Sequence, residues 1–482
     1  MLMKNPRRGC LVLLALFGFI WIALRLLGDA QWPTPGSISG RPQWAFELAG
    51  WRRPHGSTNT TSAAAQEHGD TLPSTHHELV SHSTPTGRYF DIDFLDMHVM
   101  NPNILPHPLI AYHFLVVGQL DGALTTPPHM VFAEVSCTAA FAPDNATLRC
   151  VELPTVLPIA NTTIADPEKN CPGNLMLLTL GSGPHDARVF HGPAGPLVVY
   201  GSNSGLVCFG QWAQDLRSLV PDVPWDDAAV DKSGILVASA LAQPFVQAAE
   251  LHRPPPLGAL EKNFFLFWDL DGALHAHYDV YPHRAFAAVD PVTGMAGPDL
   301  GASSPQQRAL DAACLGHYLP AIPAKVEGSW DSEAVHQATN TLLVTLCRRA
   351  DVGCRATEAN TVVVTVVQHK KHYEMHAHYE PYAVAFAPRA PFGLVGVSSK
   401  PLLVRGRGTS GVAGTDGKVH GVANEMFYIV SMSWRGSRQR WHGYLDDELF
   451  LAFGIEDKAS GGIDVRAEDL LYGLGLCNAT TA

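Results

Sequence analysis

The chain has 482 residues, of which 46% are hydrophobic and 16% charged, and its formal net charge is −12 at pH 7. This length allows one large domain or two to three ordinary ones, with enough apolar residues for a sizeable core. The negative charge, with no basic patch interleaved with aromatic residues, leads us to expect no nucleic-acid partner.

The N-terminus has the charge pattern of a targeting segment. Lys4, Arg7 and Arg8 precede an apolar run over residues 10–24, and Arg25 closes that run. Basic residues ahead of an apolar segment tend to stay in the cytoplasm, so we expect the bulk of the chain on the other side of the membrane.

Two alternatives remain for this segment. It is either a cleaved signal peptide, with Gly28-x-Ala30 as the small-residue cleavage site, or an uncleaved anchor of about 18 residues, with Arg25 extending its charge to the interface. We favour the anchor, because the apolar run is at the long end of what signal peptides carry.

The expected domain organisation follows from the anchor. Residues 1–28 form a cytoplasmic tail and signal-anchor helix, residues 29–85 a flexible stem rich in Pro, Gly, Ser, Thr and His, and residues 86–482 the folded body. The expected location is the ER or Golgi, as a single-pass type II membrane protein, with secretion as the alternative if the N-terminus is cleaved.

Glycosylation motifs and cysteines agree with a lumenal or extracellular body. Acceptor motifs begin at Asn59, Asn145, Asn161 and Asn478. Beyond Cys10 the cysteines are even in number, as disulfides require, and their spacing matches no zinc pattern. They are Cys137, Cys150, Cys171, Cys208, Cys314, Cys347, Cys354 and Cys477. Cys347 and Cys354 flank a short loop, RRADVG, and are the pair that we expect first.

The body consists of short β-branched or aromatic runs bounded by Gly, Pro, Asn or Asp, which is typical of β-strands. These runs cover residues 110–118, 196–202, 264–268, 273–281, 340–347, 360–368, 382–387, 426–434 and 449–455. The best helical period is the short stretch 331–340, DSEAVHQATN, and the ending DVRAEDLLYGL is compatible with a last helical turn. We therefore predict an all-β fold, as a propeller, sandwich or large barrel, and the length favours a propeller.

Asp269-Leu270-Asp271 follows an apolar run and has two interpretations. In nucleotide-sugar transferases an Asp-x-Asp of this kind holds a divalent ion, but there it ends a parallel strand in an α/β domain. Here Asp-Gly stands between two strand-like runs, which is a strong hairpin signal. We favour a solvated turn and expect no metal site and no cofactor.

The flanks of this hairpin carry a candidate anion site. Lys262 enters the first strand and His283 leaves the second, so both are expected at the same end of the hairpin. A lysine and a histidine that converge can bind an anion. Asp186 and Arg188 precede another strand, where a carboxylic acid near a cation is a candidate general acid. The alternatives are surface charge at Lys262, a turn residue at His283 and a salt-bridged turn at Asp186.

These residues carry a resemblance to glycoside hydrolase family 130 and its relatives among the β-1,2-mannosyltransferases. The order and spacing of the short motifs agree with that family over roughly residues 98–465. The motifs are Asn101-Pro102, Asp186-Ala187-Arg188, Glu261-Lys262-Asn263-Phe264 and Pro282-His283, with Tyr444, Asp446 and Asp447 in the place of a closing Tyr-Gly-x-x-Asp element. Two positions depart from the family pattern, namely Ala187 in place of Pro and His185 where an acidic residue is common.

The resemblance implies a five-bladed β-propeller with a central pocket. It implies that Asp186 is the catalytic acid or base and that Arg188, Lys262 and His283 line a sugar or phosphate site. Asn101, Glu261, Asn263, Tyr444, Asp446 and Asp447 complete the expected substrate-binding set. The expected function is then a membrane-anchored lumenal β-mannosyltransferase acting on glycans. A secreted β-mannoside phosphorylase or hydrolase and a non-catalytic glycan-binding propeller are the alternatives.

Overall fold

The structure is a computed structural model, and it describes residues 75–126, 129–225, 242–323, 333–373, 376–413, 419–436 and 441–477. The predicted anchor, most of the predicted stem and the motifs at Asn59 and Asn478 lie outside these ranges. Within them, no helix is both long and apolar enough to cross a membrane.

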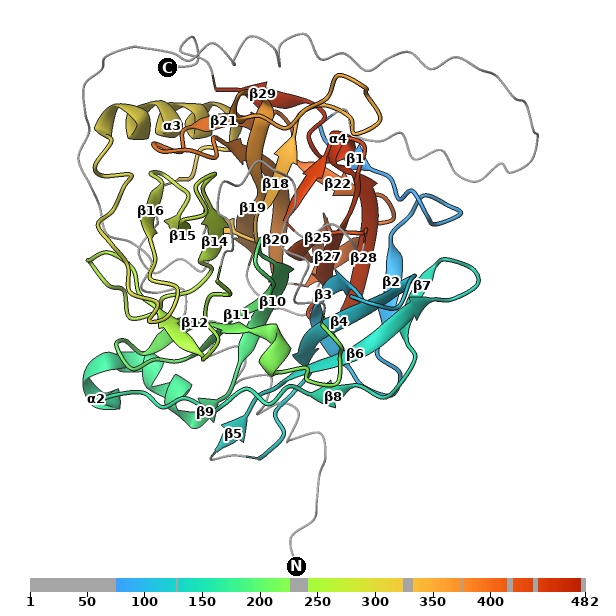
Figure 1. The fold of residues 1–482 in the computed structure, drawn as a ribbon. Coiled ribbons are helices and arrows are strands. Elements are labelled where there is room, and N and C mark those ends of the chain that lie inside the picture. The colour runs from blue at the N-terminus through green and yellow to red at the C-terminus, as the bar shows by residue number, and fades with distance from the viewer. Residues whose placement is uncertain are drawn as a thin grey trace, which may run out of the picture.

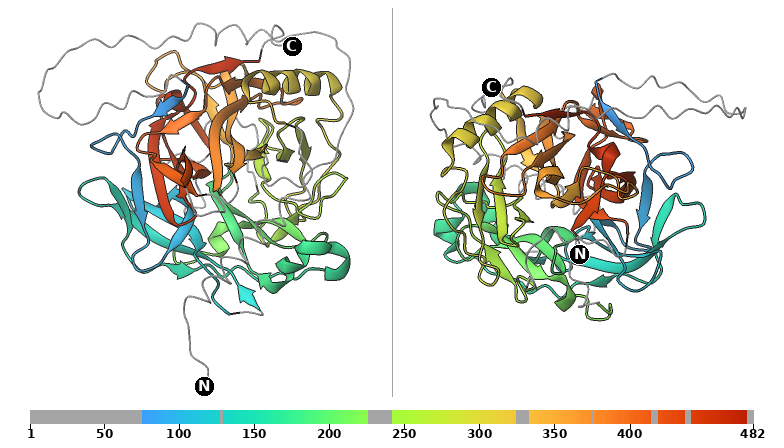
Figure 2. Two further views of the ribbon diagram at one scale, coloured as in Figure 1. Left: turned by 180° about the vertical axis from the view of Figure 1, so that it is seen from behind. Right: turned by 45° about the horizontal axis from the view of Figure 1, so that its top comes forward.

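The described chain is mostly β-strand, and its sheets lie around a common centre in chain order (Figure 1). Figure 2 shows the same arrangement from two further sides. Each of the apolar runs expected to form strands overlaps with one, because β-branched and aromatic side chains pack well on a pleated, half-buried surface. The predicted all-β class is confirmed, and the nearly closed ring of sheets fits a β-propeller.

The largest sheet path joins the beginning of the ring to its end. Its order is β25-β27-β28-β2-β7-β6-β4-β3, with β8 on β6. The strands are β2 (Phe90–Asp93), β3 (Val99–Pro106), β4 (His113–Leu120), β6 (Glu134–Phe141), β7 (Thr147–Cys150), β8 (Thr155–Val156), β25 (Phe427–Trp434), β27 (Glu448–Ile455) and β28 (Ala459–Arg466).

Strand β2 is the junction within this path. It pairs antiparallel with β28 and parallel with β7, so an early strand lies between late and early parts of the chain. Gly462 permits the close approach, since a Cβ there would lie 2.6 Å from the ring of Phe90. Closing a ring by pairing its two chain ends leaves fewer sheet edges exposed.

Two smaller sheets follow along the chain. The first has the order β10-β11-β12-β13 and the second the order β14-β15-β16. Their strands are β10 (His185–His191), β11 (Pro196–Asn203), β12 (Phe209–Asp215), β13 (Ala249–Leu251), β14 (Phe265–Trp268), β15 (Leu274–Asp279) and β16 (Ala285–Ala288).

The next sheet has the order β26-β18-β19-β20-β21-β29, with β17 also on β19, and three strand pairs complete the fold. The strands of this sheet are β17 (Glu333–Gln337), β18 (Leu342–Thr345), β19 (Thr361–Tyr373), β20 (His376–Phe386), β21 (Leu394–Ser398), β26 (His442–Tyr444) and β29 (Leu474–Leu476). The pairs are β1 (His77–Leu79) with β22 (Leu402–Val404), β5 (Met130–Val131) with β9 (Gly181–Ser182), and β23 (Thr409–Ala413) with β24 (Val419–Asn424).

Within the described ranges the helices are few. They are α2 (Pro167–Asn170), α3 (Pro305–Tyr318) and α4 (Ala467–Leu470), with short 3-10 turns at η3 (Gly173–Leu180), η4 (Leu216–Ser218) and η5 (Glu358–Asn360). The expected last helical turn is α4. The expected helical stretch 331–340 is instead strand β17, whereas α3, which packs beside β21, was not predicted.

The folded body begins earlier than the sequence suggested. Strand β1 lies within the range 29–85 assigned to the stem, and it pairs in parallel with β22. Ser81 donates a hydrogen bond to the buried carboxylate of Asp464 at 2.5 Å. Residues 77–81 therefore belong to the packed structure rather than to a linker.

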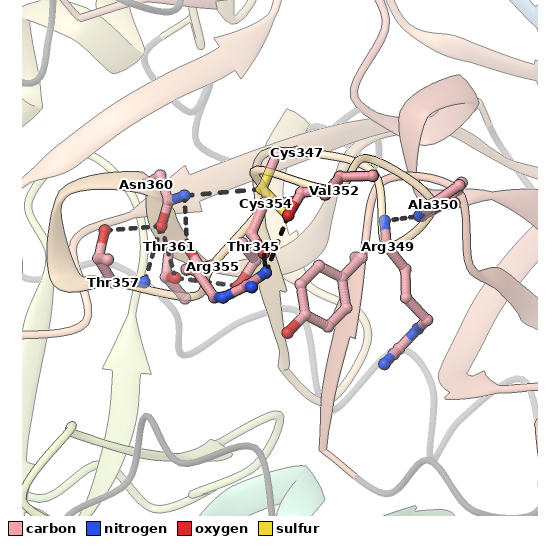
Figure 3. The surroundings of a disulfide bond; sticks show 12 residues. Thr345, Cys347, Arg349, Ala350, Val352, Cys354, Arg355, Thr357, Asn360 and Thr361 are labelled. Carbon is pink, nitrogen blue, oxygen red and sulfur yellow. Dashed lines mark hydrogen bonds between the residues drawn. A yellow bond between two sulfur atoms is a disulfide. The ribbon is translucent and has the colours of Figure 1, made fainter.

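All eight cysteines of the body form disulfides, as their even number suggested. The pairs are Cys137–Cys150, Cys171–Cys208, Cys314–Cys477 and Cys347–Cys354. The predicted Cys347–Cys354 pair is confirmed, and Figure 3 shows the short loop that it closes. Cys314–Cys477 ties α3 to the chain just beyond β29, the two segments lying side by side at the same end of the molecule.

The Asp269–Asp271 stretch is the predicted hairpin turn between β14 and β15. The Asp269 carboxylate accepts the backbone N–H groups of Asp271 and Ala273 at 2.9 and 2.8 Å, and Gly272 has a φ of +83°. Asp271 pairs with Arg389 at 2.6 Å. Both carboxylates therefore have structural roles in a surface turn.

Candidate functional site

Asp186 lies on a kink at the start of β10. The pairing of β10 with β11 shifts register between His185 and Arg188, and Asp186 has a left-handed φ of +52°. Its side chain is exposed to solvent, whereas Ala187 and Arg188 on its C-terminal side are buried. A bulge of this kind turns one side chain away from its sheet, and bulges occur often at active sites.

Two neighbouring side chains fix Asp186. The side-chain amide of buried Asn101, on β3, donates to Asp186 Oδ1 at 3.1 Å. The backbone N–H of Asp186 donates to the side-chain oxygen of Gln119, on β4, at 2.9 Å. The carboxylate and backbone of Asp186 are therefore held by strands that precede it in the ring.

Left-handed backbone recurs among the residues around Asp186. The φ angles of Asn101, Asp186, Asn263 and Asp457 are +53°, +52°, +64° and +49°. Each such conformation is costly for a residue with a Cβ, and clusters of them occur where the surrounding structure holds functional groups in place. These residues come from four distant parts of the sequence, so the fold brings this strain together.

Arg188 connects the parts of the site. Its Nη2 donates to the side-chain oxygen of Asn263 at 3.1 Å and to the hydroxyl of Tyr428 at 3.0 Å. Its Nε donates to the carbonyl of Ala338 at 2.7 Å, and its Nη1 to the carbonyl of Asp186 at 3.3 Å. The buried guanidinium thus joins β10 to the segments before β14, after β17 and within β25.

Lys262 adds a second cation next to Asp186. Burial lowers the pKa of its ammonium, and Arg188 lowers it further, while the negative charge of Asp186 opposes both. Among the described residues, none forms a hydrogen bond or ion pair with Lys262 that would neutralise it. The structure thus brings Asp186, Arg188 and Lys262 together.

Asp457 is a site residue that sequence reasoning missed. It lies in the turn between β27 and β28 and remains exposed to solvent. Desolvation of the carboxyl group by the surrounding protein raises the pKa of Asp457 to about 6. The negative charge of Asp186 adds to that shift, and the positive charge of Lys370 opposes it. The charge of Asp186 therefore acts on the Asp457 carboxyl group.

The same turn reaches the site through Gly454. A Cβ at this position would lie 2.4 Å from the side-chain oxygen of Asn101, so only glycine allows the contact. Phe453-Gly454-Ile455-Glu456-Asp457 matches the expected aromatic-Gly-x-x-Asp order. This segment, rather than residues 444–447, contacts the residues around Asp186.

Tyr444, Asp446 and Asp447 belong to a different cluster, around the Cys347–Cys354 loop. Asp447 pairs with Arg349 at 2.7 Å, and the Arg349 guanidinium lies 4.2 Å from the ring centroid of Tyr444. Asp446 accepts the backbone N–H of Arg349 at 2.6 Å. Their described contacts stabilise this loop, and none of those contacts reaches Asp186, Arg188 or Lys262.

Glu261 and His283 have no described contact with Asp186. Glu261 is buried, accepts the N–H of Gly258 and lies 3.4 Å from Arg253, and burial raises its pKa. His283 has its pKa lowered by burial and by Arg308 of α3. The convergence of His283 with Lys262 that we predicted therefore has no support among the described contacts.

A buried chain of hydrogen bonds supports Asn263 from behind. Gln337 donates to the Asn263 carbonyl at 2.7 Å, and its side-chain oxygen lies 2.7 Å from His277 Nδ1. Arg284 Nε donates to His277 Nε2 at 3.0 Å, which requires the proton on Nδ1 of a neutral His277. Burial and Arg284 lower the His277 pKa well below its usual range, in agreement with that tautomer.

The arrangement places an exposed carboxyl group beside two cations and a second carboxyl group. A carboxyl group that is held by hydrogen bonds and open to solvent can transfer protons, and Arg188 with Lys262 can stabilise a developing negative charge. Within the described ranges, no three His, Cys, Asp or Glu side chains are grouped so as to hold a metal ion.

Comparison with known proteins gives distant structural likenesses. No protein-family model and no curated protein matches the chain. A β-1,2-mannobiose phosphorylase from Listeria innocua is 11% identical, with a TM-score of 0.37, over 78% of this chain and 92% of that chain.

Two further solved structures show likeness of the same degree. A GDP-Man-dependent mannosyltransferase from Leishmania mexicana is 10% identical, with a TM-score of 0.34, over 78% of this chain and 88% of that chain. An endo-arabinase from Bacteroides thetaiotaomicron is 10% identical, with a TM-score of 0.34, over 78% and 96%.

Proposed function

We propose that this protein is a carbohydrate-active enzyme that transfers a β-mannosyl group to a glycan, with Asp186 as its acid/base. The observation that supports the proposal is the Asp186 cluster. An exposed carboxylate in a left-handed conformation is oriented by Asn101 and stands beside Arg188 and Lys262. The sequence motifs that resemble family 130 include these same residues.

The proposed step is a displacement at the anomeric carbon of the donor sugar. Asp186 takes the proton of the acceptor hydroxyl, the acceptor oxygen bonds to the anomeric carbon, and the bond to a phosphate-bearing leaving group breaks. Arg188 and Lys262 offset the negative charge that the leaving group gains, because charge-assisted hydrogen bonds to phosphate are strong in a partly desolvated site. Run in reverse, the same geometry is that of a phosphorylase.

Hydrolysis is the second candidate. The presence of a second carboxyl group, that of Asp457, near Asp186 favours it. Inverting glycosidases use one carboxyl group as acid and a second as base for water. A carboxyl group whose pKa is raised to about 6 next to Asp186 supplies such a partner. In that case Asp457, the group with the raised pKa, protonates the glycosidic oxygen, and the Asp186 carboxylate activates the water.

We further propose a five-bladed propeller in the lumen of the ER or Golgi. Division of the large sheet path at the β2–β7 junction leaves five groups of strands in chain order, which supports the blade count. Four disulfides support an oxidising compartment. The N-terminal charge pattern supports an anchor, with secretion as the alternative.

A substrate panel tests the function. The purified full chain is offered nucleotide sugars, mannose 1-phosphate and β-mannosides, with glycan acceptors, with phosphate or with water alone, and each reaction is repeated with EDTA. Transfer predicts a glycan product that requires both a mannosyl donor and an acceptor. Hydrolysis predicts mannose release in water alone. If no sugar is converted or bound under any of these conditions, the proposal is wrong.

A further inference from the structure

Glu134 is a buried acid behind the proposed site that the chemistry above does not use. It is the first residue of β6, and its side chain has 0% exposure. Its Oε1 accepts the backbone N–H of Ala187 at 3.1 Å, whereas its Oε2 has no hydrogen-bond partner among the described residues. A fully buried carboxylate with a vacant oxygen is costly, so its presence calls for a reason.

The contacts around Glu134 form a cradle for the bulge of Asp186. Gln119 accepts the N–H of Asp186, and Glu134 accepts the next N–H along the chain. Asn103 donates to the Ala187 carbonyl at 2.9 Å and accepts the Val189 N–H at 2.8 Å. Side chains of β3, β4 and β6 thus replace the ladder partners that the register shift removes.

We infer that Glu134 is a positioning residue that, as a neutral carboxylic acid, holds the bulge presenting Asp186 to substrate. The inference rests on the proposed function of Asp186 for its consequence in catalysis. Its geometric part is separate, because the hydrogen bond to Ala187 fixes the backbone adjoining a left-handed residue whatever Asp186 does.

The charges around Glu134 agree with the neutral form. Burial raises the pKa of Glu134 to about 8, the Ala187 N–H opposes the shift, and the negative charge of Asp186 adds to it. On β10, burial holds the pKa of His185 at about 4, so that this ring is uncharged. The two cations interact with Asp186 instead. Arg188 donates a hydrogen bond to its carbonyl, and Lys262 interacts with its charge. Ionisation of Glu134 would therefore place a second, unscreened negative charge behind Asp186.

The first experiment needs no substrate. Because the folded-state pKa of Glu134 is raised, the folded protein holds a proton that the unfolded chain releases, so this group costs stability as pH rises from about 5 to about 8. In Glu134→Gln that loss disappears, and the unfolding constant of the wild type should rise relative to the variant by up to about tenfold per pH unit in this window. Denaturant titrations at pH 5, 6, 7 and 8 measure the difference.

A matched control separates the effect of removing this buried acid from the effect of replacing any glutamate by glutamine. Glu250, on β13, also accepts a backbone N–H, from Gly205 at 3.0 Å, at a place remote in sequence from β6 and β10. Only a change in the pH dependence of stability beyond that of Glu250→Gln is assigned to Glu134. Parallel curves for the wild type and Glu134→Gln would overturn the inference, since Glu134 would then be charged in the folded protein.

The second experiment tests positioning. Crystal structures should show Asp186 in its left-handed conformation in Glu134→Gln, which keeps the acceptor oxygen, and displaced in Glu134→Ala, which removes it. With a substrate in hand, Glu134→Ala should lose about 10²-fold in turnover. Glu134→Gln should retain turnover at pH 7. Above pH 8 its turnover should fall less than that of the wild type.

The two arms also separate failure of this inference from failure of the proposed function. Parallel stability curves for the wild type and Glu134→Gln, together with an intact bulge in Glu134→Ala, would overturn the inference while leaving the catalytic role of Asp186 standing. A shifted bulge and an altered stability profile, in a protein that converts no sugar, would support the positioning role and remove the proposed function.

Discussion

The left-handed backbone at Asp186 illustrates how single residues are set in this protein. A non-glycine residue at a φ of +52° persists only where its neighbours hold it, and here the carboxylate and the backbone N–H of Asp186 each have a partner on another strand. Three further left-handed residues, Asn101, Asn263 and Asp457, share this environment. Side-chain orientation at the site therefore depends on contacts between strands more than on local propensity.

Substitution at Gly454 tests that dependence. Gly454→Ala would place a Cβ 2.4 Å from the side-chain oxygen of Asn101, and Asn101 orients Asp186. We expect turnover to fall by about 10²-fold, because small misplacements of a reacting group have effects of this size. Gly353→Ala is the control, since nothing lies within 4 Å of its Cβ position. Equal activity of the two variants would show that Asn101 does not orient Asp186.

Asp457 gives a prediction on pH. Its folded-state pKa of about 6 lies above that of the unfolded chain, so the stability it contributes at low pH is lost as pH rises through about 6. Asp457→Asn should therefore be more stable than the wild type at pH 7.5, by less than about 1 kcal/mol given the solvent exposure of this group. The two proteins should be equally stable at pH 4. Denaturant unfolding at both pH values measures this, and a less stable variant at pH 7.5 contradicts it.

Among the elements, the strand pattern could be predicted from the sequence and the helices less so. The apolar runs around Asp-Gly and similar turns became strands, because alternation and turn chemistry are local signals. The helical period of residues 331–340 gave way to strand β17, which pairs with β19 along its length. Tertiary pairing overrode a weak local preference there, and it also drew residues 77–79 out of the expected stem.

The site was predictable only where a motif lay in a single segment. Two short motifs identified one pair each, Asp186 with Arg188 and Lys262 with Asn263. The structure connects the two pairs through the hydrogen bond from Arg188 to Asn263. Gln119, Glu134 and Tyr428 carry no local signal, because their roles arise from strands that meet only in the folded ring. Asp457 had a signal, the aromatic-Gly-x-x-Asp order, which we first placed on residues 444–447.

The hydrogen-bond chain behind Asn263 gives a prediction for an element. Gln337→Ala would remove the partners of the His277 Nδ1–H and of the Asn263 and Tyr278 carbonyls in a buried place. We expect a stability loss of roughly 2–4 kcal/mol, because buried polar groups would lose their hydrogen bonds. Thermal or denaturant unfolding measures it. Gln214→Ala is the surface control, as its amide contacts only Ser218 among the described residues. A stability loss as small as that of Gln214→Ala would contradict the structural role of this hydrogen-bond chain.

At the scale of the molecule, the ring is held together by pairing of early and late strands and by disulfides of different span. Strand β2 joins β28 to β7, and Cys314–Cys477 links residues 163 apart in sequence. Cys347–Cys354, in contrast, spans only 7. The long link constrains the unfolded chain much more than the short one.

Paired removal of the disulfides measures this difference. Loop-closure entropy predicts a loss of about 5 kcal/mol for Cys314→Ala with Cys477→Ala, and of about 2 kcal/mol for Cys347→Ala with Cys354→Ala. Denaturant unfolding of the two double variants provides the comparison. The reverse order of stability would show that local packing at the Arg349 loop matters more than chain entropy.

The central claim is that Asp186 performs proton transfer at a sugar site, and the turnover of Asp186→Asn with the substrate found in the panel tests it most directly. Asp271→Asn, in the exposed hairpin turn, is the matched control. The account predicts that Asp186→Asn loses 10²- to 10⁴-fold in turnover, as expected for an acid/base, while its Kd for the glycan stays within about threefold and the control keeps full activity. Unchanged turnover in Asp186→Asn would remove Asp186 from the mechanism and the proposed chemistry with it.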